Sequence, residues 1–298
     1  MDSIELETAP LQHSPCVGVC TLDQATGWCL GCGRSGDEVA RWIAMSEAER
    51  RACWAELPRR LERLAVATHL LPWAPAEIAD WAGETLAAGA GTWVVGVPGA
   101  LGEFPCGPAH GVKLARGPDA VFGRAGKAAF RLRLHEKLRA FTFGKTGPIV
   151  LGLPKARIVL PVAATLTLLG PDDRAIDAQH RAQSLFDFGL GRASSRFCIR
   201  TGNADLIAAL KAQCGQPWPK VMAAIGLMLL AHNPHRVVES SLARIEVTTP
   251  IPAPGTVTPP GAHTHFLPEF LQAGKEAPAG LALPDYALPV AIYYPPQR

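Results

Sequence analysis

Four cysteines near the amino end constrain this chain more than any other feature of its sequence. Cys16, Cys20, Cys29 and Cys32 follow the spacing C-x3-C-x8-C-x2-C, whereas the other four of the chain's eight cysteines are scattered. Short spacings let two thiolates of one turn reach the same ion, and the longer loop lets the second pair fold back. Four thiolates at such spacings hold either a structural zinc ion or an iron–sulfur cluster. Spacing alone does not decide between these two cofactors.

Two or three short helices are expected directly after the cysteine loop. Ser35 with Glu38, and Ser46 with Glu49, each fit a capping box, in which the serine and the glutamate satisfy backbone N–H groups at a helix start. Pro58 is expected to end or kink the second helix, with a further turn or two beyond it. A module this small buries little apolar surface, so a bound metal would supply the missing folding free energy.

The remainder of the chain predicts a larger, mixed α+β domain. The 27 prolines and 29 glycines of the chain indicate many turns and short elements. Residues 130–134, FRLRL, alternate as a half-buried strand does, whereas residues 204–213 and 219–232 have the pattern of helices. Strands and helices without regular alternation are typical of the α+β class. We therefore expect a cysteine-rich metal-binding module at residues 1–66, a linker at 67–75 and an α+β domain at 76–298.

Charge and apolar runs limit the kinds of partner. The formal net charge is +3 without a long basic block, so we expect no nucleic-acid partner. The longest apolar run, from Val221 to Ala231, falls short of the roughly 20 residues that span a bilayer, so we expect no membrane partner. The first residues, MDSIELETAP, lack the apolar stretch of a secretion signal. We expect a cytoplasmic protein, a compartment in which clustered cysteines bind metal more often than they form disulfides.

A histidine pair near the carboxyl end offers a second candidate metal site. His263 and His265 lie in the stretch AHTHF, and on an extended strand their side chains point to the same side. Glu269 would add a carboxylate, and His235 a further ligand. The alternative interpretation is that these histidines cap loops or hydrogen-bond to the backbone of a proline-rich turn.

Two segments carry family resemblances. The segment "SPCVGVCTLD…TGWCLGCGRSGDEVARWIAMSEAERRACWAELPRR", at residues 12–62, is similar to a short, widespread proteobacterial domain family of unknown function, usually labelled predicted iron–sulfur protein. This resemblance implies that the four clustered cysteines are the ligands of an iron–sulfur cluster. Residues 75–295, with stretches such as SLFDFGLG and CIRTGNADLIAAL, resemble an uncharacterised, mostly alphaproteobacterial family. That second resemblance implies no particular chemistry.

Three functional hypotheses follow. The leading one is a metal-binding protein whose four-cysteine site, iron–sulfur or zinc, serves a redox partner or docks a protein partner. The second is a metal-dependent enzyme that uses the histidine pair of the larger domain. The third is a zinc-stabilised adaptor that presents Trp42 and Trp54 to another protein. The sequence identifies no reaction and no substrate.

Overall fold

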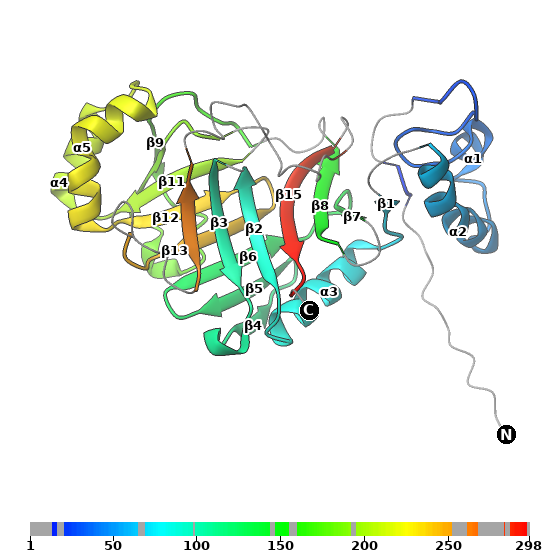
Figure 1. The fold of residues 1–298 in the computed structure, drawn as a ribbon, viewed down its shortest axis with the longest axis horizontal. Coiled ribbons are helices and arrows are strands. Elements are labelled where there is room, and N and C mark those ends of the chain that lie inside the picture. Colours follow the sequence, from blue (N-terminus) through cyan, green and yellow to red (C-terminus); the bar gives the residue numbers. More distant parts are fainter. Residues whose placement is uncertain are drawn as a thin grey trace.

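Two antiparallel sheets packed face to face form the body of the protein (Figure 1). The computed structural model describes residues 14–16, 21–64, 69–97, 99–143, 147–154, 160–191, 195–251, 261–267, 283 and 287–296. Within these residues, a short helix and a longer one follow the cysteine loop, and a larger, strand-rich domain comes after them. The predicted α+β class is confirmed.

A seven-stranded sheet carries the histidine pair on an end strand. Its order is β1-β7-β8-β15-β2-β3-β14. β2 and β3 form a hairpin, and β15, from the far end of the chain, pairs with both β2 and β8. The sheet is therefore assembled by long-range pairing. In sheet order, its strands are His69–Leu70, Arg139–Thr142, Ile149–Pro154, Ala287–Tyr294, Thr92–Val97, Ala100–Pro105 and His263–Phe266.

An eight-stranded sheet packs against the first, in the order β4-β5-β6-β13-β12-β11-β10-β9. In that order its strands are Lys113–Arg116, Ala120–Ala125, Ala128–Arg133, Ala243–Val247, His235–Glu239, Arg196–Thr201, Ser184–Asp187 and Thr167–Pro171. Phe130 and Leu132 of β6 are fully buried in the main core, where Phe130 stacks on Trp93 of β2 with ring centroids 5.0 Å apart. The alternation predicted for this segment is thus confirmed for both residues.

The opposite face of the eight-stranded sheet buries ion pairs. Arg244 donates to Glu239 and Glu246 at 2.7 Å each, and Glu239 also accepts from Arg174 and Arg196 at 2.6 Å each. Although burial opposes it, these guanidinium groups lower the pKa of Glu239 to about 2. Buried charges persist in proteins when they are paired and hydrogen-bonded in this way.

Four of the described helices lie at the ends of the sandwich, whereas α3 packs against β4, β5 and β7 (Figure 1). α4 and α5 contact each other at one end, and α1 and α2 lie at the other. α3 begins at Pro75, as the sequence predicts, because proline is suited to the first helical position. No helix in the described part of the chain is long and apolar enough to cross a membrane. The helices are α1 (Gly36–Arg41), α2 (Glu47–Arg63), α3 (Pro75–Ala87), α4 (Ala204–Ala212) and α5 (Trp218–His232), with 3-10 turns η1 (Pro108–His110) and η2 (Ala178–His180).

The two amino-terminal helices pack on the edge of the seven-stranded sheet. Both predicted capping boxes are confirmed. Pro58, expected to end or kink the second helix, lies inside α2, which continues to Arg63 and so includes the further turn expected beyond the proline. Leu57 and Leu61 on either side of Pro58 are at most 1% exposed and pack with Leu70 of β1 and Phe141 of β7. Their burial offsets the backbone hydrogen bond that proline cannot make.

The tryptophans assigned to an adaptor surface lie inside this interface. Trp42 is 7% exposed and Trp54 is 3% exposed, in the same cluster as Leu70 and Phe141. The expectation that they are presented to another protein is therefore wrong. Their side chains are buried within the protein itself.

Candidate metal centres

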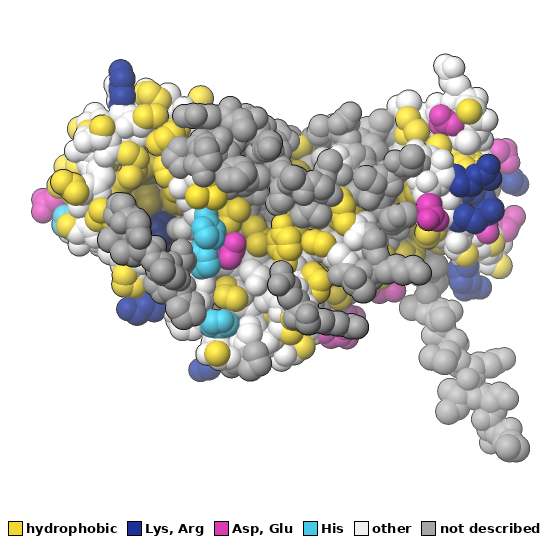
Figure 2. Space-filling model, in the orientation of Figure 1, with side chains coloured by type: hydrophobic (Ala, Val, Ile, Leu, Met, Phe, Trp, Pro, Cys, Tyr) yellow, Lys and Arg dark blue, Asp and Glu magenta, His cyan; other side chains and the backbone are white. Residues whose placement is uncertain are grey.

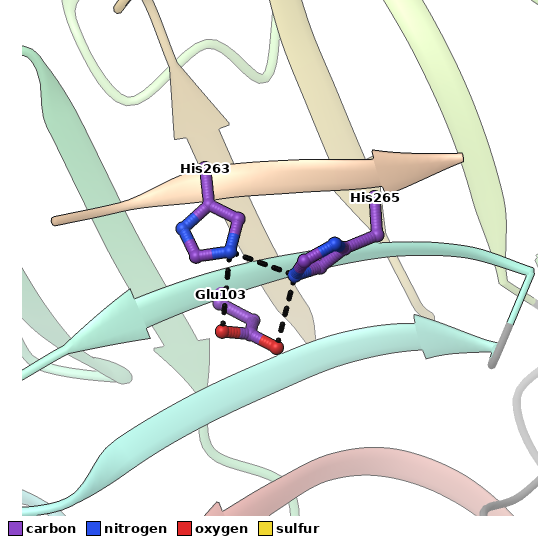
Figure 3. A group of neighbouring side chains, drawn as sticks. All are labelled: Glu103, His263 and His265. Atoms are coloured by element: carbon purple, nitrogen blue, oxygen red, sulfur yellow. Dashed lines mark hydrogen bonds and ion pairs between the residues drawn. The ribbon is translucent and has the colours of Figure 1, made fainter. Parts of the chain in front are cut away.

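The pairing of β14 with β3 brings two histidines and one carboxylate together (Figure 3). His263 and His265 project from the same face of β14, as predicted, and Glu103 of β3 lies directly opposite His263 in the strand register. Side chains two residues apart on a strand share a face, so both histidines meet the carboxylate. Among the described residues, this is the group whose candidate ligand atoms all lie within 4.8 Å of one another.

The separations of the three side chains suit a single ion. His263 Nε2 lies 2.7 Å from His265 Nε2 and 3.4 Å from Glu103 Oε2, and His265 Nε2 lies 3.2 Å from Glu103 Oε1. Metal–ligand bonds of about 2.0–2.2 Å place neighbouring ligand atoms about 3–3.5 Å apart. The two distances to the carboxylate oxygens fall in this range, whereas the 2.7 Å between the imidazole nitrogens is a hydrogen-bond distance, so a bound ion would require the two rings to separate slightly.

The backbone orients one ring of the pair. His263 Nδ1 lies 2.7 Å from the carbonyl oxygen of Gly261. Because a carbonyl only accepts, Nδ1 carries the proton and donates it, which leaves the Nε2 lone pair directed at His265 and Glu103. Metal-binding histidines are commonly held in this way, with the second ring nitrogen donating to a carbonyl.

Glu103 is kept ionised by its neighbours. The hydrogen bond from His265 lowers the pKa of Glu103, against the opposing effect of burial. The side chains remain reachable, with 31% of Glu103, 29% of His265 and 18% of His263 exposed. Three protein ligands and partial exposure leave coordination positions for water or a substrate, an arrangement typical of catalytic rather than structural metal sites.

The other residues predicted for this site lie elsewhere or were not described. The structure places His235 on β12, where its Nδ1 accepts a hydrogen bond from Arg200 at 2.9 Å. Burial, with the nearby charge of Arg200, lowers the pKa of His235 to about 4. Glu269 lies outside the described residues. The sequence reasoning missed Glu103, although an isolated carboxylate in the apolar stretch VVGVPGALGEF was a signal that could have found it.

The second pair of the cysteine cluster is brought together in the amino-terminal module. Cys29 and Cys32 are reduced and buried, and a hydrogen bond joins their sulfurs. This bond lowers the pKa of Cys29 and raises that of Cys32, which favours the thiolate at Cys29. The backbone N–H groups of Cys32 and Gly31 also donate to the Cys29 sulfur. Thiolate character of this kind is what a metal requires of its ligand.

A buried arginine supports this pair. Arg34 is 2% exposed, its Nε donates to the Cys32 sulfur at 3.4 Å, and its guanidinium lies 4.7 Å from the ring centroid of Trp42. Gly33 has φ +75° and sits where a Cβ would lie 3.3 Å from Leu61 of α2. Glycine at this turn therefore permits the loop both to bend and to approach the helix.

The first pair of the cluster is only partly described. Cys16 is half-buried close to Arg139 of β7, and that guanidinium donates to the carbonyl oxygen of Ser14 at 2.6 Å. Cys20 lies outside the described residues. Participation of all four cysteines in one site stays a prediction.

Comparison with known proteins divides the chain in two. The model of a family of unknown function, DUF6925, matches residues 77–298, which include Glu103, His263 and His265. The model of a protein family of unknown function, DUF1289, matches residues 14–61, which include the four clustered cysteines. Both candidate metal centres thus fall within family matches, and neither family description names a chemistry.

Similarity to individual proteins is confined to the amino-terminal segment. The uncharacterized protein YdhL of Escherichia coli strain K12 is 44% identical over 61 residues, which cover 19% of this chain and 75% of YdhL. YdhL of Shigella flexneri matches to the same extent. No solved structure matches this chain.

Proposed function

The chain belongs to the family of unknown function DUF6925, and we propose that it binds a divalent metal ion through Glu103, His263 and His265. The observation that carries this proposal is the convergence of three candidate ligand atoms within 4.8 Å on neighbouring strands. Two imidazoles and one carboxylate on one face of an ion suit zinc, or iron(II) in an oxygen-activating site.

The kind of ligand set favours catalysis over a structural role. Structural zinc sites are closed by four protein ligands, whereas three ligands leave room for a bound water or a substrate. A metal here would supply a Lewis acid and would lower the pKa of a bound water. The residues of the chain would hold the ion, with Gly261 fixing the ring of His263 and Glu103 contributing one negative charge.

A hydrogen-bonded trio without metal is the competing interpretation. A proton on His265 Nε2 would satisfy both the 2.7 Å contact with His263 and the 3.2 Å contact with Glu103. A metal ion would replace that one proton. Elemental analysis distinguishes the two states directly.

The test is elemental analysis of the protein purified without oxygen, as wild type and as the double variant His263→Ala with His265→Ala. We expect the double variant to lose one equivalent of metal. The control is His232→Ala, an exposed histidine at the end of α5, which should keep the full metal content. Equal metal content in wild type and the double variant would show that the histidines hold no ion.

We propose a second metal at the cysteine cluster, an iron–sulfur cluster or zinc, with a protein or redox partner as its counterpart. The contact between Cys29 and Cys32, with backbone N–H groups and Arg34 directed at their sulfurs, favours it. An absorption spectrum of wild type and of the Cys29→Ser, Cys32→Ser variant tests it. A visible band that the variant lacks would identify iron–sulfur, and metal without a band would identify zinc. Unchanged metal and spectrum in the variant would remove this second site.

A further inference from the structure

A groove runs along the outer face of the seven-stranded sheet, beside the Glu103–His263–His265 group. Its volume is about 280 Å³. Sites for drug-sized ligands have volumes of about 300–1,000 Å³, so this groove suits a smaller molecule. Figure 2 shows histidine and acidic side chains on this face next to a strip of hydrophobic side chains. The groove is lined by the side chains of Thr92, Val94, Leu101, Glu103, Ile292 and Tyr294, among others.

The groove is apolar along its length and polar at the metal group. Val94 and Ile292 face each other across the β2–β15 pair, in a cluster that Leu101 and Tyr294 join. Glu103 lies opposite Val94 in the β2–β3 register, so the carboxylate that would bind the metal also borders the groove. A molecule lying in the groove would therefore touch hydrocarbon along its body and the metal with its head.

The charge at the proposed metal site favours one kind of polar head group in a ligand of the groove. A divalent ion with one carboxylate and two neutral imidazoles keeps one positive charge, which an anionic ligand would neutralise. Tyr294 also lines the groove, and a phenol can donate a hydrogen bond to an anion. Both features favour an anion over a neutral or cationic head.

We propose that the groove binds a small amphiphilic monoanion, with its carboxylate on the open positions of the metal and its hydrocarbon chain along Val94 and Ile292. This inference rests on the proposed metal site. It adds the class of ligand, which the metal ligands alone do not specify. Each methylene group that enters the groove should tighten binding about fourfold, from the free energy of burying a CH₂ group.

The experiment titrates the metal-containing protein with acetate, butanoate, hexanoate and octanoate by calorimetry. We expect affinity to rise with chain length in wild type and the rise to disappear in Val94→Phe, whose larger ring fills the groove. Thr92→Trp, at a half-buried position in the same groove, is a second variant in case the first folds poorly. The control is Leu114→Trp on β4 of the other sheet, at a position 37% exposed, which should behave as wild type.

The outcomes separate this inference from the proposed function. Wild-type protein that contains the metal but binds all four acids equally would overturn the ligand class and leave the metal site standing. The same holds if both groove variants keep the chain-length dependence of wild type. Wild-type protein without metal at the histidines would overturn both proposals together.

Discussion

The two candidate metal centres are built in opposite ways. In the amino-terminal module, Cys29 and Cys32 lie in one turn, and the elements that support them follow directly in the chain. In the sandwich, Glu103 and His263 are distant in sequence and meet because β3 pairs with β14. A local site can be recognised from residue spacing, whereas a site made by strand pairing can be recognised only once the topology is known.

Removal of metal should produce the largest difference between the two regions, because only the amino-terminal module is expected to unfold. The module has few buried residues apart from its contact with the sandwich, so its folding should depend on the metal, whereas the sandwich has a large apolar core. We expect protein refolded with a chelator to lose hydrogen-exchange protection at residues 21–64 and to keep it in β2 and β3. Restored protection after adding metal back is the control. Protection of the module in metal-free protein would contradict this view of its folding.

The ion pairs of the eight-stranded sheet should give the next largest effect. Glu239→Gln would leave Arg174, Arg196 and Arg244 without their shared carboxylate, and we expect a loss of about 3–5 kcal/mol in the free energy of unfolding. Because the folded-state pKa of Glu239, about 2, lies below its ordinary value of 4.5, this stabilisation is complete above pH 4.5 and is lost as the pH falls toward 2. Denaturant titrations of wild type and variant at several pH values measure it. A difference in the free energy of unfolding between wild type and variant that stays constant down to pH 2 would contradict the ion pairs assigned to Glu239.

A smaller effect is expected inside the module. Arg60 of α2 donates to both carboxylate oxygens of Glu38 of α1, at 2.5 and 3.1 Å, with both side chains mostly buried. Arg60→Met should cost about 1–2 kcal/mol in the free energy of unfolding. Arg59→Met is the matched control, because its pair with Glu56 is exposed and should contribute less than about 1 kcal/mol.

The pH dependence of this pair has a defined sign. Burial opposes ionisation, but the hydrogen bonds from Arg60 and Ser35 lower the pKa of Glu38 below its ordinary value. The pair therefore stabilises the module above the ordinary pKa of 4.5, and its contribution is lost as the pH falls through the lower folded-state pKa. The difference between wild type and Arg60→Met should narrow at acid pH. A difference that widens there would contradict the ion pair.

Sequence patterns predicted the local features of this protein and missed the ones made by distant segments. The capping boxes at Ser35 and Ser46 and the helix start at Pro75 depend on neighbours in the chain, and all three are confirmed. The shared side of His263 and His265 followed from strand alternation alone. The pairing of β14 with β3 has no such local signature, so Glu103 was not found and Glu269, next along the chain, was chosen instead.

The same limit explains two features of the module. Pro58 interrupts helix formation as a local rule, but the burial of Leu57 and Leu61 against the sheet overrides it. Trp42 and Trp54 are buried in an apolar cluster that includes Leu70 and Phe141 from beyond the module, and the sequence of the module alone does not contain that information. Tertiary contacts decided both cases.

Among the described strands, β14 is the last of its sheet and pairs only with β3. A terminal strand can detach at a lower free-energy cost than an inner one, because fewer backbone hydrogen bonds and apolar contacts are broken. An ion bound by His263, His265 and Glu103 would link β14 to β3 by bonds additional to the strand pairing. Binding of the ion would therefore raise the free-energy cost of detaching β14 from the sheet.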